Sequence, residues 1–302
     1  MHDDDEGMQM PPAARAVRWR LRDTALVLPA SGDRTAHLMA ICNVTPDSFS
    51  DGGEHLSVPL AVEYAATSFR EGAVLIDIGG ESTRPGAVPV SADIELERVL
   101  PVVRSVRERI PDALLTIDTV KAGVARAALA AGVHAVNDVS GGRLDPEMFD
   151  VVAAASAGIV IMHSRGSVAD MASLRMAQYG SDVVGDVCAE LMVQVGKARA
   201  AGIPGEAIVL DPGIGFSKTS VDSIALLREL HRVVALGFPV LVGASRKRLI
   251  GELTGGREPS QRVIGSAVAH AIAVERGASV VRTHDVRATR EALAVMRGLR
   301  IA

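Results

Sequence analysis

The chain has 302 residues, of which 48% are hydrophobic and only 3% aromatic, and its formal net charge is −4. This length suits one large α/β domain with a sizeable core. Nucleic-acid binding needs a strongly positive face and stacking aromatic side chains, and the sequence offers neither. No apolar run approaches the roughly 20 residues of a membrane span. We therefore expect neither a nucleic acid nor a membrane as a partner.

The first 16 residues, MHDDDEGMQMPPAARA, are acidic and contain proline but lack the apolar stretch of a signal peptide. We expect a flexible, disordered tail over residues 1–16 and a short hairpin over residues 17–36. The two cysteines, Cys42 and Cys188, are too few for a disulfide framework. They are interpreted as reduced packing residues of a cytoplasmic protein.

Beyond residue 36, short apolar runs alternate with segments of helical length and pattern. Continuous, β-branched runs are typical of parallel strands that are covered on both faces. The predicted strands are His37–Val44, Ala73–Ile78, Ala113–Asp118, His134–Asp138, Gly158–His163, Ala207–Asp211, Pro239–Ser245 and Ala278–Asp285. The helices between them include 93–109 and 120–132, and glycines placed as C′ residues precede strands at Gly72, Gly132, Gly202, Gly237 and Gly277.

Eight successive strand–helix units predict a single (β/α)₈ TIM barrel over residues 37–302, with the hairpin plugging its lower end. A doubly wound sheet is the alternative, but no G-x-G-x-x-G follows the first strand. In a barrel all strands end on one face, so the polar residues at these ends should converge there. For Asp77 and Asp138 taken alone, capping of the next helix explains the residue equally well.

Eight motifs lie at these strand ends. In chain order they are NVTPDSFSDGG (43–53), DIGGESTRPG (77–86), IDT (117–119), NDVSGG (137–142), MH (162–163), DPGIGF (211–216), VLVGASRKR (240–248) and RTHDV (282–286). The set closely resembles dihydropteroate synthase, a pterin-binding barrel family, over Leu38–Gly298. The resemblance implies an enzyme of folate biosynthesis that condenses 6-hydroxymethyl-7,8-dihydropterin pyrophosphate with p-aminobenzoate to give 7,8-dihydropteroate and pyrophosphate.

The resemblance also implies roles for individual residues. A buried carboxylate can bind the N–H groups of an aminopyrimidine edge with paired hydrogen bonds, and Asp211 matches the family's residue for that purpose. The implied pterin-binding residues are Asp118, Asn137, Met162, Asp211, Phe216, Lys247 and Arg282. Implied contacts to pyrophosphate or p-aminobenzoate come from Phe49, Thr83, Arg84, Pro85, Ser245, Arg248, Arg282 and His284.

Chemistry of this kind needs a stabilised leaving group more than a base, because the arylamine is already nucleophilic. We therefore expect an SN1-like displacement, helped by Arg282, His284, Lys247 and Asn43 as the catalytic residues. The resemblance implies Mg²⁺ as cofactor, with Asn43 as its protein ligand. The loops around residues 45–53 and 83–85 are expected to fold over the substrates and exclude water.

Four positions depart from the commonest family pattern: Ser217 replaces glycine, Ile224 replaces asparagine, Thr283 replaces valine and Arg248 replaces serine. The Arg248 change leaves open which group anchors the benzoate carboxylate. Two alternatives remain, a pterin-binding paralogue without synthase activity and a pterin-dependent methyltransferase. The methyltransferase would need a corrinoid partner domain, which this chain lacks. The resemblance implies a homodimer formed through apolar surface on the last helices.

Overall fold

A computed structural model describes residues 17–29, 33–45, 57–82, 88–171 and 173–299. Its central feature is an eight-stranded parallel sheet in the spatial order β8-β7-β6-β5-β4-β3-β10-β9. The strands are β3 (His37–Asn43), β4 (Ala73–Gly79), β5 (Leu114–Asp118), β6 (Ala135–Asp138), β7 (Gly158–Met162), β8 (Ile208–Asp211), β9 (Leu241–Val242) and β10 (Val280–Thr283). This order runs once around a barrel, as the sequence predicts.

The barrel closes between β8 and β9, and these two strands share little regular hydrogen-bond pairing. One parallel bridge joins Leu210 to Val240, and the Leu210 N–H donates to the Pro239 carbonyl at 2.9 Å. The predicted strand over 239–245 is therefore shortened to the two residues of β9. Pro239 has no N–H to donate, which accounts for the irregular start of this strand.

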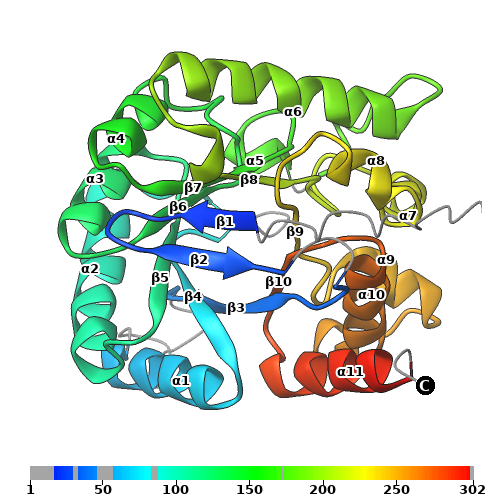
Figure 1. Cartoon of the computed structure of the whole chain (residues 1–302), viewed down its shortest axis with the longest axis horizontal. Coiled ribbons are helices and arrows are strands. Elements are labelled where there is room, and N and C mark those ends of the chain that lie inside the picture. Colours follow the sequence, from blue (N-terminus) through cyan, green and yellow to red (C-terminus); the bar gives the residue numbers. More distant parts are fainter. Residues whose placement is uncertain (1–16, 30–32, 46–56, 83–87, 172, 300–302) are drawn as a thin grey trace, which may run out of the picture.

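Helices surround the barrel (Figure 1). They are α1 (Val58–Arg70), α2 (Ala92–Arg109), α3 (Ala122–Ala130), α4 (Met148–Ala154), α5 (Val168–Met171), α6 (Val183–Ala200), α7 (Ser220–Arg228), α8 (Leu230–Val234), α9 (Arg248–Leu253), α10 (Val263–Glu275) and α11 (Val286–Gly298), with 3₁₀ turns at Gly205–Ala207 and Pro259–Gln261. The five glycines predicted as C′ residues all have positive φ. In the described ranges, no helix is long and apolar enough to cross a bilayer.

Local sequence explains where these helices begin. The Ser91 hydroxyl caps α2 by accepting the Ile94 N–H, and Asp93 places a carboxylate in the positive first turn. On the barrel-facing side, Val99 and Val103 are completely buried. The capped start and the apolar face together fix this helix against the sheet.

The predicted hairpin is present and plugs the N-terminal end of the barrel. Its strands β1 (Val17–Arg20) and β2 (Ala25–Leu28) pair antiparallel and lie across the strands in Figure 1. Trp19 is fully buried, and its Nε1–H donates to the Ala207 carbonyl at 3.0 Å. It packs with Leu21 and Leu28 against inward-facing barrel residues Met39, Leu75, Ala135, Val160, Val209, Leu241 and Val280. The lower end is thus closed by apolar packing.

Candidate active site

A cavity of about 620 Å³ opens at the opposite, C-terminal end of the strands. We call it the barrel cavity. Eleven side chains predicted from the sequence as site residues lie in the described ranges, and all of them line it: Asn43, Asp118, Asn137, Met162, Asp211, Phe216, Ser245, Lys247, Arg248, Arg282 and His284. Residues separated by more than two hundred positions therefore meet in one place. Phe49, Thr83, Arg84 and Pro85 lie outside the described residues.

The residue that sequence reasoning undervalued is Asp77. It is completely buried in β4, where its Oδ2 accepts hydrogen bonds from Arg282 Nε at 2.6 Å and Asn137 Nδ2 at 2.8 Å. Its Oδ1 accepts from the hydroxyl of Thr116 on β5. Asp77 is thus an internal anchor that orients two cavity residues, and the capping interpretation for it is wrong. The available signal was an aspartate inside an otherwise apolar strand.

Asp138 has a structural role, but it does not cap the next helix, because α4 begins only at Met148. Its carboxylate accepts the Ser140 and Gly142 backbone N–H groups at 2.7 and 2.8 Å, which fixes the turn after β6. It does not line the barrel cavity.

Arg282 bridges two carboxylates. Its Nε binds Asp77 and its Nη2 binds Asp118 Oδ2, both at 2.6 Å. Burial raises the pKa of Asp118, although Arg282 opposes that rise. The two carboxylates are fixed acceptors, and together they orient the planar guanidinium of Arg282.

Asp211 and Lys247 form the second charged part of the cavity. Asp211 is buried at the end of β8, and its Oδ1 accepts the Gly213 N–H at 2.7 Å. Burial raises the pKa of this carboxyl to about 6. The Lys247 ammonium lies 3.6 Å from the centroid of the Phe216 ring, and burial together with Arg282 lowers its pKa to about 7. A flat ligand bound beside this ring would meet a carboxylate and a cation.

His284 is oriented by Ser245. The Ser245 hydroxyl accepts the His284 backbone N–H at 3.1 Å and lies 3.0 Å from His284 Nδ1. Because the hydroxyl can donate to Nδ1, this arrangement favours the tautomer with the proton on Nε2. The Tyr64 hydroxyl donates to the His284 carbonyl at 3.1 Å and holds the backbone. Ser245 thus lines the cavity and also orients the His284 imidazole.

Arg248 and Arg262 bring further cations to the cavity wall. The Nη2 group of Arg248 donates to the Lys218 carbonyl at 3.0 Å. Arg262, which the sequence did not suggest, donates from Nη1 to the Arg246 carbonyl at 3.0 Å. Both guanidiniums lie beside the start of α9, where an anionic group on a ligand would be attracted.

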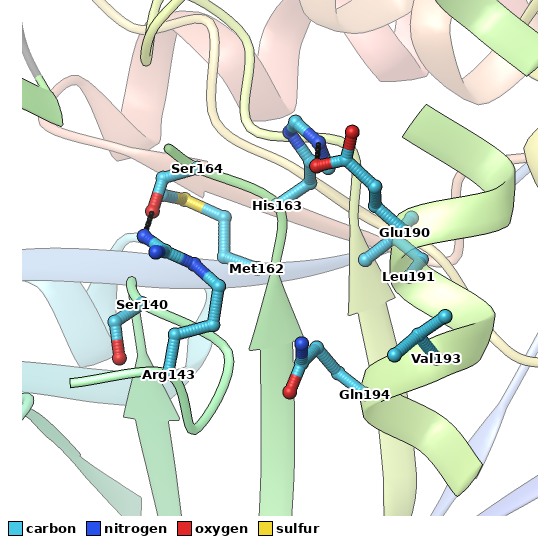
Figure 2. Close-up of a pocket in the computed structure, with 9 residues that line it drawn as sticks. All are labelled: Ser140, Arg143, Met162, His163, Ser164, Glu190, Leu191, Val193 and Gln194. Atoms are coloured by element: carbon cyan, nitrogen blue, oxygen red, sulfur yellow. Dashed lines mark hydrogen bonds and ion pairs between the residues drawn. The ribbon is translucent and has the colours of Figure 1, made fainter. Parts of the chain in front are cut away.

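A second, smaller cavity of about 100 Å³ lies outside the barrel wall, between β7 and α6 (Figure 2). Arg143 and Ser164 face it from the strand side, and Glu190 and Gln194 face it from α6. Met162 lines both cavities. Its side chain therefore belongs to the wall that separates the larger site from the outer helical layer.

The barrel and its cavity together define a class of protein. A buried carboxylate, an amide and an apolar ring suit a flat heterocycle rich in N–H groups, while Arg282, His284 and Lys247 suit an anionic tail. Their position at the C-terminal face is where barrel enzymes carry out catalysis. The protein is thus an α/β-barrel enzyme with a site for a flat heterocycle and an anion.

Comparison with known proteins gives the family. The model of the pterin binding enzyme family matches residues 39–284. A dihydropteroate synthase of Synechocystis sp. is 47% identical over 85% of this chain and 87% of its own length. The structure of Xanthomonas albilineans dihydropteroate synthase with 4-aminobenzoic acid has a TM-score of 0.86 and 43% identity, covering 95% of this chain and 99% of that one.

Another solved structure, Burkholderia cenocepacia dihydropteroate synthase complexed with 7,8-dihydropteroate, has a TM-score of 0.83 and 39% identity, covering 95% of this chain and 97% of that one. The chain belongs to the dihydropteroate synthases, which are transferases of the pterin-binding family.

Proposed function

We propose that the barrel cavity holds 6-hydroxymethyl-7,8-dihydropterin pyrophosphate with its aminopyrimidine edge on Asp211 and Asn137. The observation that carries this is the buried Asp211 carboxylate, which shares one cavity with Asn137 and the Arg282 guanidinium. The ionised carboxylate accepts two N–H groups of the ring, and Met162 contacts one of its faces. A ring without those donors would leave buried polar groups unpaired, so the site discriminates strongly.

In the proposed reaction, the bond between the pterin CH₂ carbon and the pyrophosphate oxygen breaks first. The electron pair leaves with pyrophosphate, and the positive charge spreads into the electron-rich ring. Arg282 and His284 stabilise the departing anion, with Arg282 pre-oriented by Asp77 and the imidazole pre-oriented by Ser245. Fixed groups of this kind need no reorganisation as charge develops, which is why they lower the barrier.

The arylamine of p-aminobenzoate then forms the new C–N bond, and the ammonium proton is released to water or to pyrophosphate. Phe216, with the Lys247 ammonium over its ring, would form a wall beside the CH₂ carbon. For the carboxylate of p-aminobenzoate, Arg248 and Arg262 offer positive charge at the cavity wall. Phe49, Thr83, Arg84 and Pro85 stay predicted contacts of this substrate.

Mg²⁺ fits the donor set of the cavity. Asn43 ends β3 and lines the cavity with an amide, and a hard cation that is bound mainly by substrate phosphates and water needs few protein oxygens. Among the residues that the structure describes, no group of three or more His, Cys, Asp or Glu could form a separate metal site. Asn43 would thus hold the ion, and when bound it would neutralise pyrophosphate charge.

We further propose a cytoplasmic homodimer. Both cysteines are free thiols, which suits a reducing compartment. On α10, Ile264, Val268 and Ile272 recur every four residues and are 80%, 52% and 42% exposed. Val295 and Leu299 extend an apolar surface along neighbouring α11. A second copy of the chain would cover this face.

The test is direct synthesis. Purified protein with the pterin pyrophosphate, p-aminobenzoate and Mg²⁺ should form dihydropteroate and release one pyrophosphate per product. Tight pterin binding without product would instead select the non-catalytic paralogue. Omitting p-aminobenzoate is the matched control, and it separates condensation from simple hydrolysis of the pyrophosphate.

A further inference from the structure

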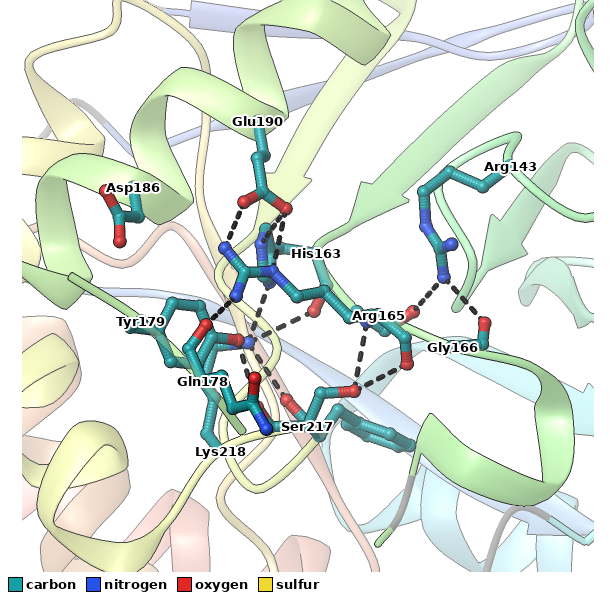
Figure 3. Close-up of polar contacts among 12 residues, drawn as sticks. Arg143, His163, Arg165, Gly166, Gln178, Tyr179, Asp186, Glu190, Ser217 and Lys218 are labelled. Atoms are coloured by element: carbon teal, nitrogen blue, oxygen red, sulfur yellow. Dashed lines mark hydrogen bonds and ion pairs between the residues drawn. The ribbon is translucent and has the colours of Figure 1, made fainter. Parts of the chain in front are cut away.

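Lys218 is completely buried, yet it does not line the barrel cavity. Its Nζ lies 2.8 Å from His163 Nδ1, 3.0 Å from the Phe216 carbonyl oxygen and 3.3 Å from the His163 carbonyl oxygen (Figure 3). A buried amine is costly, whereas a methionine would fill the same space without that cost. The three directed contacts therefore call for a role beyond packing.

His163 receives this contact in a defined state. It follows β7, is 4% exposed, and its Nε2 lies 3.0 Å from Glu190 Oε2 on α6. Burial, with a contribution from Lys218, lowers the His163 pKa to about 4, so the ring is neutral near pH 7. Nε2 then donates to Glu190 while Nδ1 accepts from Lys218. Arg165 also binds Glu190 and fixes that carboxylate (Figure 3).

We call Lys218, His163 and Glu190 the Lys218 brace. It meets the loop after β8 at several points. The His163 N–H donates to the Asp211 carbonyl at 2.9 Å. Gly213 has a φ of +68°, and a Cβ there would overlap the His163 carbonyl oxygen. Lys218 itself holds the Phe216 carbonyl. The brace therefore supports the loop from outside while Asp211 and Phe216 face the cavity from inside.

The far end of the loop is tied down as well. The Ser217 N–H donates to the Met171 carbonyl at 2.6 Å, and the Tyr179 hydroxyl donates to the Ser217 carbonyl at 3.0 Å. Ser217 adopts a φ of 49°. These contacts hold the backbone directly after Phe216, while the Lys218 amine holds the Phe216 carbonyl itself. The ring on that residue then faces Lys247.

We propose that Lys218 is a positioning residue for the condensation: held by His163 and Glu190, its amine fixes the Phe216 carbonyl and thereby the ring wall against which p-aminobenzoate binds. The inference rests on the proposed function, because it assigns the Phe216 ring to the second substrate. Under this proposal Lys218 contributes to substrate affinity although it touches no substrate. Removing the amine should loosen the wall without removing any group that stabilises pyrophosphate.

The experiment uses the full chain with Lys218→Met, which keeps the stem and removes the donor. We expect KM for p-aminobenzoate to rise about tenfold, with kcat within about threefold of wild type, because groups that act only in the transition state are intact. Val106→Ala, which removes buried methyl groups on distant α2, is the control for general destabilisation. It should lower the melting temperature and leave both KM values unchanged.

A second pair of variants keeps the test decisive if Lys218→Met does not fold. His163→Asn retains an acceptor for the Lys218 amine, whereas His163→Leu does not. KM for p-aminobenzoate should rise less in the asparagine variant than in the leucine variant. A folded Lys218→Met enzyme with wild-type KM, or equal KM values in the two His163 variants, would overturn the proposal.

A readout that does not depend on turnover completes the design. Nitrogen-15 NMR of the histidines should show His163 protonated only on Nε2 between pH 6 and 8, with its Nδ1 signal shifting in Lys218→Met. A His163 spectrum that the variant leaves unchanged would contradict the brace. Absence of dihydropteroate formation by the wild type would count against the proposed function instead, and the nitrogen signals would still decide the brace.

Discussion

At the scale of single residues, the cavity depends on how its charges hold one another. Asp77 does not itself line the barrel cavity, yet it accepts hydrogen bonds from Arg282, Asn137 and Thr116. Arg282 gains a second fixed acceptor in Asp118. The orientation of the Arg282 guanidinium is therefore set in part by Asp77, a residue that lies behind the cavity wall.

Asp77→Asn should reduce kcat/KM by about 30- to 1000-fold, which corresponds to about 2–4 kcal/mol of lost transition-state stabilisation. The variant keeps the shape but presents an amide N–H₂ to donors and removes the charge that orients Arg282. Asp182→Asn, which breaks an exposed Asp–Arg pair with Arg232, is the matched control and should have no effect. Steady-state kinetics of both variants provide the measurement, and equal activities would refute the anchoring role of Asp77.

If Asp211 binds the pterin as proposed, its ionisation should make pterin binding depend on pH. Burial raises its pKa to about 6, so the carboxylate is charged above that pH and protonated below it. Only the charged form accepts both ring N–H groups, so affinity is complete above pH 6 and falls about tenfold per unit below. Calorimetric titration with a 6-hydroxymethylpterin from pH 4.5 to 8 would measure it. Asp211→Asn should bind weakly with no such slope, and a slope that survives in that variant would assign it to another group.

At the scale of elements, the packing of the hairpin and the predicted site residues lie at opposite ends of the barrel. Trp19 is buried at the N-terminal end, whereas every predicted site residue that the structure describes lies at the other end. Trp19→Ala should lower the free energy of unfolding by about 3–5 kcal/mol, since it removes a large buried side chain and leaves a cavity. Denaturant unfolding measures that loss.

The same variant should keep its KM values below its melting temperature. Val27→Ala, at a half-exposed position of β2, is the control and should change neither property. A large activity loss in folded Trp19→Ala would show that the two ends of the barrel are coupled.

The elements also show what the sequence can predict. Apolar runs ended by Asn43, Asp118 or Asp211 located the strands and the face on which they converge, because barrel geometry brings all strand ends together. The short β9 was less predictable, since the run around Pro239 has the hydrophobicity of a longer strand. A hydrophobic run predicts that a segment is buried. Whether the segment pairs as a strand also depends on the neighbouring strand and on available backbone N–H groups.

The roles of Asp77 and Lys218 were harder to predict for a related reason. Asp77 is the first residue of the motif 77–86, so its position alone fits a cap, and only the folded sheet places Arg282 and Asn137 against it. Lys218 follows a glycine-rich turn that is typically exposed, yet it is fully buried against His163. In both cases the contacts that define the residue's environment come from partners more than fifty residues away in the sequence.

At the scale of the whole molecule, the proposed dimer would cover the exposed apolar face of α10 and α11. Ile264→Glu should convert the protein to a monomer in sedimentation analysis, because a charge placed in an apolar interface stays unpaired. Val221→Glu, at an equally exposed position on α7, is the matched control and should leave the assembly unchanged. A wild-type protein that sediments as a monomer at all concentrations would rule out the dimer.

The fold as a whole brings charged residues from distant sequence positions into one cluster. Arg282 on β10, Asp77 on β4 and Asp118 on β5 are brought into contact by the order of strands around the barrel. If Arg282 stabilises the departing pyrophosphate, its effect must be on the chemical step rather than on substrate binding alone.

Kinetics of Arg282→Met measure this most directly, with Arg282→Lys as the variant that keeps the charge but not the paired geometry. We predict that kcat falls about 10²- to 10³-fold in Arg282→Met, as for loss of a group that stabilises a developing anion, and falls less in Arg282→Lys. KM for p-aminobenzoate should stay within about threefold of wild type. An Arg282→Met enzyme with undiminished kcat and only a raised KM would contradict the proposed role of Arg282.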